Sequence, residues 1–258
     1  MNYKEDLKIG FKKISIPYHL AKQDIIIRFR LSVLGPIWLT ISTGLFIASL
    51  TFIMNVGMGA ELLRILPHLS TGLIIWTFIQ SSINDSCTVY ISNSELIKNL
   101  PIPKSIFIFQ FLIRNFIIFI FNLINFIIVL IFFKNTININ ILYLIPNLIL
   151  FFIIMINICL LISLLATRFN DILQMVSIFL QIFFFITPIF WLPDLIEGKF
   201  IFLDLNPLYH LIELIRAPLL GYNIKNITLV YCLTFSVILS ILSYIAYKKN
   251  YSRIINWL

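Results

Sequence analysis

The side chains that could carry out catalysis are few and lie apart along the chain. His210 and Glu213 form H-x-x-E, which is not the H-E-x-x-H arrangement that holds zinc in metalloproteases. The chain has no G-x-S-x-G serine motif and no G-x-x-x-x-G-K-[S/T] phosphate-binding loop. Cys87, Cys159 and Cys232 are far apart in apolar surroundings, so they are expected to be free, buried thiols. The sequence therefore predicts a chain without a catalytic site, a metal or a bound cofactor.

The composition predicts an all-α, polytopic membrane protein. Of 258 residues, 60% are hydrophobic and 12% are charged, and this charged share is about half that of an average soluble chain. So few charged side chains do not cover the surface of a soluble protein of this size, and disorder is excluded more strongly still. The net charge of +8 is therefore expected to set the orientation in a membrane rather than to bind nucleic acid.

The spacing of the charges predicts six membrane-spanning helices in a single domain, 1–258. Six intervals without Asp, Glu, Lys or Arg are 19 to 33 residues long, and about 20 residues are needed to cross the hydrocarbon core. The polar stretch 135–140 turns the longest interval into one span preceded by a loop. The predicted spans cover about 33–56, 66–88, 107–133, 141–166, 172–193 and 226–247.

The distribution of basic residues predicts that both termini are cytoplasmic. With six spans and the amino terminus inside, 14 of the 19 Lys and Arg residues lie on the cytoplasmic side, as the positive-inside rule requires. The first thirty residues lack the clean apolar core of a cleavable signal peptide. Arg114 is expected where the third span starts at the interface, because at mid-bilayer it would cost roughly 2.5–3.5 kcal/mol on the insertion scale.

The region before the first span, 1–32, is predicted to lie on the membrane surface. Apolar residues recur there at helical spacing beside a row of lysines: Tyr3, Leu7, Phe11 and Ile14, with Lys4, Lys8 and Lys12. Such a helix lies in the headgroup plane with its lysines toward anionic lipid. Pro17 is expected to interrupt it, and a second helical segment is predicted over about 18–31.

A short helix is predicted in the cytoplasmic segment between the second and third spans. Asn93 or Ser94 can cap it, Glu95 suits its first turn, and Pro101 and Pro103 end it. A capped helix is more than a connection between two spans needs, which indicates a docking element for a cytoplasmic partner at 94–100.

The external segment 194–225 is predicted to contain a short apolar helix. Asn206 and Pro207 form a cap followed by a first-turn proline, and Gly221 ends the helix. Glu213 and Arg216 are three residues apart and are expected to pair. An apolar helix between two spans favours a re-entrant hairpin, and such a hairpin is typical of a gate or pathway.

The predicted span centres contain amides and aromatic rings but no ionisable side chain. An ion-coupled carrier usually needs membrane carboxylates, so this class is not supported. The amides are expected to bond between helices: Asn122, Asn125, Asn157, Gln174 and Gln181. Some aromatic residues belong to interfacial belts, whereas others are candidates to line a path on which sugar rings stack. The candidates are Trp38, Phe46, Trp76, Tyr90, Phe184 and Trp191.

Four segments, in this order and spacing, give the chain a resemblance to ABC-2 type permeases that export polysaccharides. They are RFRLSVLGPIWL (28–39), SNSELIKNLPIPKSIF (92–107), TPIFWLPD (187–194) and NPLYHLIELIRAPLLG (206–221). They resemble the family's entrance segment, its coupling helix, the end of its fifth span and its external gate helices. The subgroup resembled exports O-antigen (lipopolysaccharide), capsule or teichoic-acid-like chains.

The resemblance implies a homodimer that works with two copies of a separate cytoplasmic ATPase, which binds the ATP and Mg²⁺. The cargo would be a glycan linked to an undecaprenyl-type lipid, moved outward across the bacterial cytoplasmic (inner) membrane. The chain would be a transport subunit and not an enzyme.

The resemblance also implies roles for particular residues. Leu34 and Gly35 match a pair that lies near the lipid-linked pyrophosphate in related permeases. Arg28 and Arg30 are nearby cations suited to phosphate oxygens; the alternative is that both only anchor the interfacial helix. The coupling residues are Glu95, Leu96, Ile97 and Lys98, and the gate residues are Asn206, Pro207, Tyr209, Glu213 and Arg216.

Two other functions stay open at this point. The first is an ABC-2 permease for a small lipid or a drug, which would share the fold and the ATPase. The second is a membrane enzyme acting on polyprenyl-linked substrates. An enzyme would need clustered acids or bases at the interface, where Asp85, Glu95 and Asp171 are present, but these match no catalytic pattern.

Overall fold

A computed structural model describes residues 6, 8, 10, 13–58, 61–132, 139–193 and 201–258, and every regular element among them is a helix. Five helices are long and apolar enough to cross a membrane. They are α3 (Ile37–Met58), α4 (Leu62–Ser92), α6 (Ser105–Phe132), α7 (Ile141–Arg168) and α11 (Asn226–Asn250). The prediction of an all-α, multi-pass membrane protein is confirmed.

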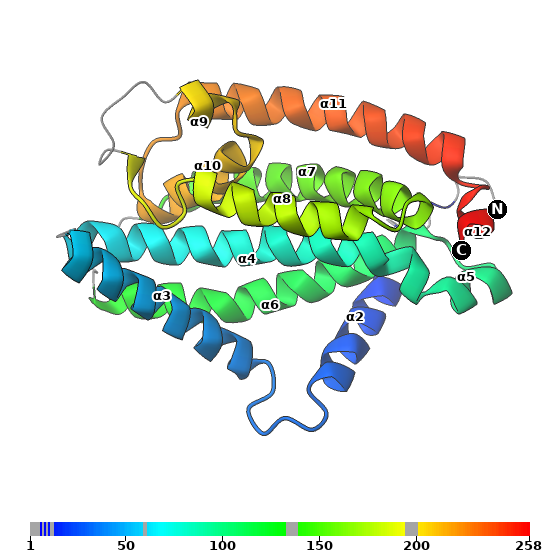
Figure 1. Ribbon diagram of the computed structural model, residues 1–258, viewed down its shortest axis with the longest axis horizontal. Coiled ribbons are helices and arrows are strands. Elements are labelled where there is room, and N and C mark those ends of the chain that lie inside the picture. Colours follow the sequence, from blue (N-terminus) through cyan, green and yellow to red (C-terminus); the bar gives the residue numbers. More distant parts are fainter. Residues whose placement is uncertain are drawn as a thin grey trace.

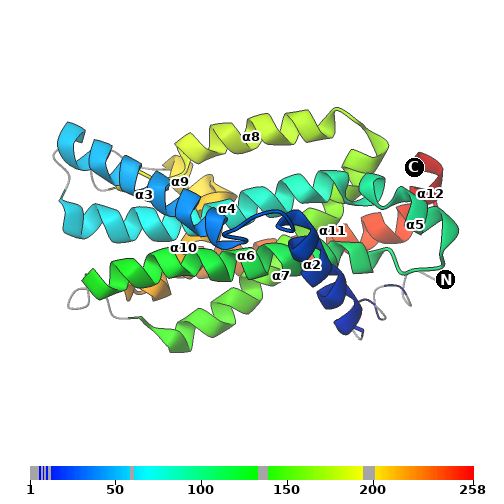
Figure 2. The ribbon, with the colours of Figure 1, turned by 90° about the horizontal axis from the view of Figure 1, so that it is seen from below.

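The central element is α4, which packs against α3, α6, α7, α8 (Ile172–Ile186) and α10 (Pro207–Leu220). Figures 1 and 2 both show α4 between α8 and α6. Its buried residues run from Ile65 to Tyr90 and lie on every face of the helix. Most of the surface of α4 therefore contacts other helices rather than lipid. Three cavities, described below, lie along this helix.

α2 (Ser15–Arg28) precedes α3 and packs against α6. A loop that projects from the bundle joins α2 to α3 (Figure 1). α2 corresponds to the second helical segment predicted over about 18–31, and Pro17 is its third residue rather than a residue between two helices. Proline is tolerated there because the first backbone N–H groups of a helix have no partner within it. Tyr3, Leu7 and Phe11 of the predicted interfacial helix lie outside the described residues.

The fifth predicted span, 172–193, is helical only over the 15 residues of α8. At 1.5 Å per residue α8 is about 22 Å long, which is shorter than the roughly 30 Å hydrocarbon core. Thr187 is extended (φ −82°, ψ 136°) because the residue before a proline, here Pro188, is disfavoured in the helical region. The helix therefore ends earlier than charge spacing alone indicates.

Two short helices follow, α9 (Ile201–Leu205) and α10, and α10 is buried among α4, α7 and α11. The Asn206 side chain caps α10, since its Oδ1 accepts from the backbone N–H groups of Leu208 (3.0 Å) and Tyr209 (3.3 Å). Gly221 ends the helix at φ +80°, a conformation that glycine adopts without strain. The cap, the first-turn proline and the glycine stop are confirmed as predicted.

Three short features gather at one end of the bundle, called here the α5 end: α5 (Ser94–Asn99), α12 (Ile254–Trp257) and the start of α6 (Figure 1). The opposite end, near α9, is called the α9 end. α5 forms where the sequence predicts a short helix, although Asn93 does not cap it. Its side chain donates to the carbonyl of Val89 instead (2.8 Å).

Candidate functional site

Three cavities follow one another along α4. The first, of about 330 Å³, lies nearest the α5 end, the second measures about 240 Å³, and the third about 380 Å³. Asp85 lines both the first and the second cavity, and Thr77 lines both the second and the third. Because neighbours share a lining residue, the cavities form a series from the α5 end toward the α9 end.

A cluster of charges from three helices surrounds the first cavity. Arg114 of α6 donates to Asp24 of α2 (3.2 Å) and to Asp85 of α4 (2.8 Å). Asp85 also accepts from Asn115 (2.8 Å), and Asp24 accepts from Gln110 (2.8 Å). Arg114 is the tenth residue of α6, and the two carboxylates are its counter-ions. The cluster ties α2 to the transmembrane core.

Arg28 and Asp85, a member of the charged cluster, both line the second cavity. Arg28, the last residue of α2, lines it together with Asp85, Asn115 and Asn122. The Oδ1 of Asn122 is buried and has no hydrogen-bond partner among the described residues. A ligand with hydroxyl donors would supply one, since a buried acceptor without a partner is costly.

The third cavity combines aromatic rings with amides. Phe46 of α3, Trp76 of α4 and Phe184 of α8 line it, together with Gln80 and Gln181. The rings of Trp76 and Phe184 have centroids 5.7 Å apart. Flat apolar rings beside amides suit a ligand that has both apolar faces and hydroxyl groups. The structure thus brings three of the six predicted aromatic residues into one cavity.

The other three aromatic candidates line none of these cavities. Trp38 is exposed on α3, and Tyr90 is fully buried in the core. Trp191 is half-buried and donates from Nε1 to the carbonyl of Phe185 (3.1 Å).

The loop after α2 holds the remaining candidates for contact with a lipid phosphate. Arg30 and Leu34 are exposed, and Gly35 has φ +57°, which favours glycine. The Gly35 N–H donates to Oγ of Ser32 (3.1 Å), which closes a turn. The loop lies next to Arg28 in sequence, but of these candidates only Arg28 lines a cavity.

The four coupling candidates divide into an anchor and an exposed surface. Ile97 is 5% exposed and belongs to the main hydrophobic core. Glu95, Leu96 and Lys98 are exposed around it. A short helix fixed by one apolar residue and displaying three others is suited to contact a partner.

Two gate candidates, Glu213 and Arg216, form an ion pair near the α9 end that also binds the Pro188 carbonyl; this group is called here the clamp. Arg216, only 2% exposed, donates from Nη1 to Glu213 (2.9 Å) and to the carbonyl of Pro188 (2.9 Å). The predicted pair of Glu213 and Arg216 is confirmed. His68 of α4 approaches the same carbonyl (3.2 Å). A side chain at Gly72 would collide with the guanidinium, so the glycine makes room for it.

The clamp connects three parts of the chain that sequence reasoning treated separately. It joins α10, the segment after α8 and α4 through one carbonyl and one guanidinium. Of the other gate candidates, Asn206 donates from Nδ2 to Oγ1 of Thr187 (2.8 Å), Pro207 begins α10, and Tyr209 is buried. All five therefore lie on or beside α10, and two of them bond directly to the segment after α8.

Sequence reasoning missed Asp6, which anchors the amino-terminal segment at the α5 end. Its carboxylate accepts from the backbone N–H of Lys104 (2.6 Å) and of Ser105 (3.1 Å) and from the hydroxyl of Tyr247 (2.8 Å). It therefore caps α6 and holds the end of α11. Burial lowers the pKa of the Lys104 ammonium, and nearby Asp6 opposes this shift.

We expect Asp85→Ala to destabilise the protein, because Arg114 and Asn115 lose their shared acceptor. The two side chains of the ion pair are about one-fifth and one-third exposed, so the loss of folding free energy is reduced by solvent to about 1–3 kcal/mol. The midpoint of thermal unfolding in detergent measures it. Asp171→Ala is the control, since Asp171 is exposed and its side chain caps no backbone N–H. Equal midpoints for both variants would contradict a structural role for Asp85.

The family model for ABC-2 type transporters matches residues 18–220, which include most of α2, all of α3 to α10 and the lining residues of all three cavities. The chain belongs to the ABC-2 type transporter family. The predicted resemblance is confirmed. The chain is therefore a transport permease and not itself an enzyme, and permeases of this family generally work with an ATPase subunit.

Two curated proteins are similar to this chain over most of its length. Both are O-antigen export system permease proteins RfbA from Klebsiella pneumoniae. One is 25% identical over 195 residues, covering 75% of each chain. The other is 26% identical over 214 residues, covering 81% of this chain and 83% of the relative. The permease described here is thus similar to O-antigen exporters over most of its length.

Proposed function

We propose that this permease is the transmembrane subunit of an exporter that moves a lipid-linked polysaccharide outward across the bacterial cytoplasmic membrane. The cargo class is an O-antigen, a capsule or a teichoic-acid-like chain on an undecaprenyl-type carrier. Two permease chains assemble with two cytoplasmic ATPase subunits, and these bind ATP and Mg²⁺. The observation that carries the proposal is the third cavity, because Trp76, Phe184 and the two glutamines match the surfaces of a sugar ring.

The orientation follows from the basic residues. The α5 end holds the last turn of α11 with Lys248 and Lys249, and it also holds α5 with Lys98. We therefore place the α5 end and both termini in the cytoplasm. In this orientation the clamp of Glu213 and Arg216 faces the outside.

Five helices are long enough to cross the membrane, and we propose that a further crossing, the fifth along the chain, consists of α8 and the non-helical segment that follows it. Backbone without helical hydrogen bonds is tolerated at membrane depth only where protein or a polar cavity surrounds it. Pro188 and Ile189 meet this condition, since both are buried and the Pro188 carbonyl accepts from Arg216. The segment and α10 together are proposed as the external gate.

The entrance for the carrier lipid is proposed at the loop after α2. Arg28 and Arg30 attract the pyrophosphate, and exposed Leu34 lies beside the turn at Gly35. Arg28 then leads toward the second cavity, whose lining includes Thr77, Ser81 and Asn122. The glycan would follow α4 outward from there.

The partner ATPase is proposed to act on α5. Closing on ATP, it pushes the exposed residues Glu95, Leu96 and Lys98, and Ile97 transmits the push because it is buried in the core. The motion rocks α4 and opens the path between two copies of the chain.

Reconstitution tests the proposal. The permease and its co-purified ATPase, placed in proteoliposomes, are expected to hydrolyse ATP faster with undecaprenyl-linked glycan than with undecaprenyl phosphate alone. A matched preparation with a drug-like or short-chain lipid substrate tests the nearest alternative, an ABC-2 permease for a small lipid or drug. Stimulation by the small molecule but not by the glycan would overturn the polysaccharide assignment.

We expect Phe184→Ala to slow glycan export while leaving the fold intact. The substitution removes one ring of the third cavity, and a ring contact is worth about 0.5–1.5 kcal/mol, or roughly two- to tenfold in rate. The surface glycan that appears after induction, measured against time, gives the rate. Phe179→Ala is the control, because Phe179 is exposed on α8 and lines no cavity described here. Unchanged export by Phe184→Ala would remove this ring from the path.

A further inference from the structure

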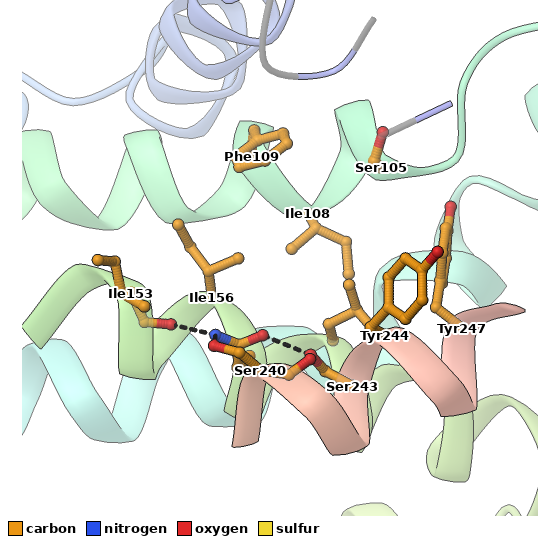
Figure 3. A pocket seen from close by; sticks show the side chains of 11 residues that line it. Ser105, Ile108, Phe109, Ile153, Ile156, Ser240, Ser243, Tyr244 and Tyr247 are labelled. Atoms are coloured by element: carbon orange, nitrogen blue, oxygen red, sulfur yellow. Dashed lines mark hydrogen bonds between the residues drawn. The ribbon is translucent and has the colours of Figure 1, made fainter. Parts of the chain in front are cut away.

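An apolar groove of about 300 Å³ lies between α6, α7 and α11. Ile108 and Phe109 of α6, Ile156 of α7, and Tyr244 and Tyr247 of α11 line it (Figure 3). It shares no lining residue with the three cavities along α4. It is therefore separate from the proposed path of the glycan.

The polar side chains of the groove use their hydrogen bonds within the protein. The amide of Asn157 donates to the carbonyl of Ile153 (2.7 Å) and to Ser240 (3.1 Å), and it accepts from Ser243. Tyr247 donates to Asp6. Because these groups are already paired, the groove offers no polar recognition and suits a hydrocarbon chain.

A second apolar cavity, of about 280 Å³, continues the groove. It shares Phe109 and Ile156 with the first, and Gly10 and Ile14 also line it. Its remaining lining residues are apolar side chains of α6 and α7. The two cavities therefore adjoin at Phe109 and Ile156, and we treat them as two parts of one apolar groove.

The length of this site matches one leaflet of a bilayer. It begins at Ser105, the first residue of α6, and reaches Phe116. Eleven residues of helix rise about 16 Å, and half of the hydrocarbon core is about 15 Å. A chain in this site would thus run from the headgroup level at the α5 end to the bilayer centre.

Basic residues stand at the mouth. Lys248 and Lys249 follow Tyr247 at the end of α11, and both are exposed. Lysines near a membrane surface attract anionic headgroups. The mouth is therefore complementary to a phosphate-bearing lipid.

We propose that this groove binds one acyl chain of a bilayer phospholipid of the leaflet at the α5 end, with an anionic headgroup at Lys248 and Lys249. The bound lipid fills the space between α6, α7 and α11, which the side chains leave open. The proposal goes beyond the export function and does not depend on it. The site is for a resident lipid rather than for cargo.

Native mass spectrometry tests the site. The purified permease is reconstituted in vesicles of phosphatidylglycerol and phosphatidylethanolamine, extracted in mild detergent, and examined for retained phospholipid. Ile156→Trp fills the junction of the two cavities, and we expect retained lipid to fall roughly tenfold, which corresponds to about 1.4 kcal/mol. Leu142→Trp is the control, because Leu142 is exposed on α7 outside the groove.

A second pair of variants guards against loss of folding. Ile153→Phe adds a smaller volume to the same groove, and its helix content is checked by circular dichroism. Lys248→Glu with Lys249→Glu is expected to lower the ratio of bound phosphatidylglycerol to phosphatidylethanolamine several-fold. Equal retention by wild type, Ile156→Trp and Ile153→Phe, or a polyprenyl phosphate as the lipid retained from cells, would overturn the proposal.

Discussion

Glu213→Ala is expected to lower the free energy of unfolding by about 3 kcal/mol or more, because it leaves the Arg216 guanidinium buried without a counter-ion. Nη1 would keep only the Pro188 carbonyl, while Nε and Nη2 already have no partner among the described residues. For a chain of this size, such a loss lowers the midpoint of thermal unfolding by roughly 6–12 °C. Differential scanning fluorimetry in detergent measures the midpoint.

Two control variants separate charge from packing. Glu213→Gln keeps an acceptor for Nη1, so we expect a smaller loss than with alanine. Glu213→Ala combined with Arg216→Met removes both charges, and replacing a buried pair by apolar groups is often neutral. If Glu213→Ala unfolds at the wild-type temperature, the pair contributes nothing to the clamp.

Leu96→Asp is expected to abolish binding of the partner ATPase while leaving the fold unchanged. Leu96 is 43% exposed on α5, whereas neighbouring Ile97 is 5% exposed and holds the helix to the core. A carboxylate introduced into the buried part of an interface loses its hydration without gaining a partner, which costs several kcal/mol, so co-purified ATPase should fall by more than about tenfold. Affinity purification of the tagged permease, with quantification of the ATPase, measures it.

Ile255→Asp provides the matched control. Ile255 lies on α12 at the same end of the bundle and is also 43% exposed. It should retain the ATPase, and both variants should unfold near the wild-type temperature. Equal loss of ATPase from Ile255→Asp and Leu96→Asp would show that α5 is not the specific docking element.

Local features of the site were predictable from the sequence because their partners lie within one helical turn. The cap at Asn206, the stop at Gly221 and the pair of Glu213 and Arg216 are of this kind. The short helix α5 was predictable from Glu95 in its first turn and from the prolines that follow it, although the predicted cap at Asn93 does not form. The end of α8 was also predictable, because Pro188 favours an extended conformation for the residue before it. The prediction from charge spacing alone placed this end too late.

Long-range contacts were not predictable from one sequence. Arg114 lies 90 residues from Asp24 and 29 from Asp85, and no periodic pattern connects them. Arg114 was expected at the interface where the third span starts, and neither carboxylate was predicted as its partner. The room that Gly72 leaves for Arg216 depends equally on how α4 and α10 pack.

For the aromatic candidates, too, the residue types were readable from the sequence but their contacts were not. Hydropathy identifies rings in spans but does not tell which helix face they occupy. Phe46, Trp76 and Phe184 meet in one cavity only because α3 and α8 both pack against α4. Tyr90 is also aromatic and, like Trp76, lies on α4, yet it is fully buried in the core and lines none of the three cavities.

The most direct test of the export function is a deletion of this permease in its native cell, with surface glycan and undecaprenyl-linked glycan measured in the same culture. We predict that surface glycan disappears while lipid-linked glycan accumulates on the cytoplasmic side, and that the intact permease restores export. Surface glycan at the wild-type level in the deletion strain, without intracellular accumulation, would contradict the assignment of this permease to polysaccharide export.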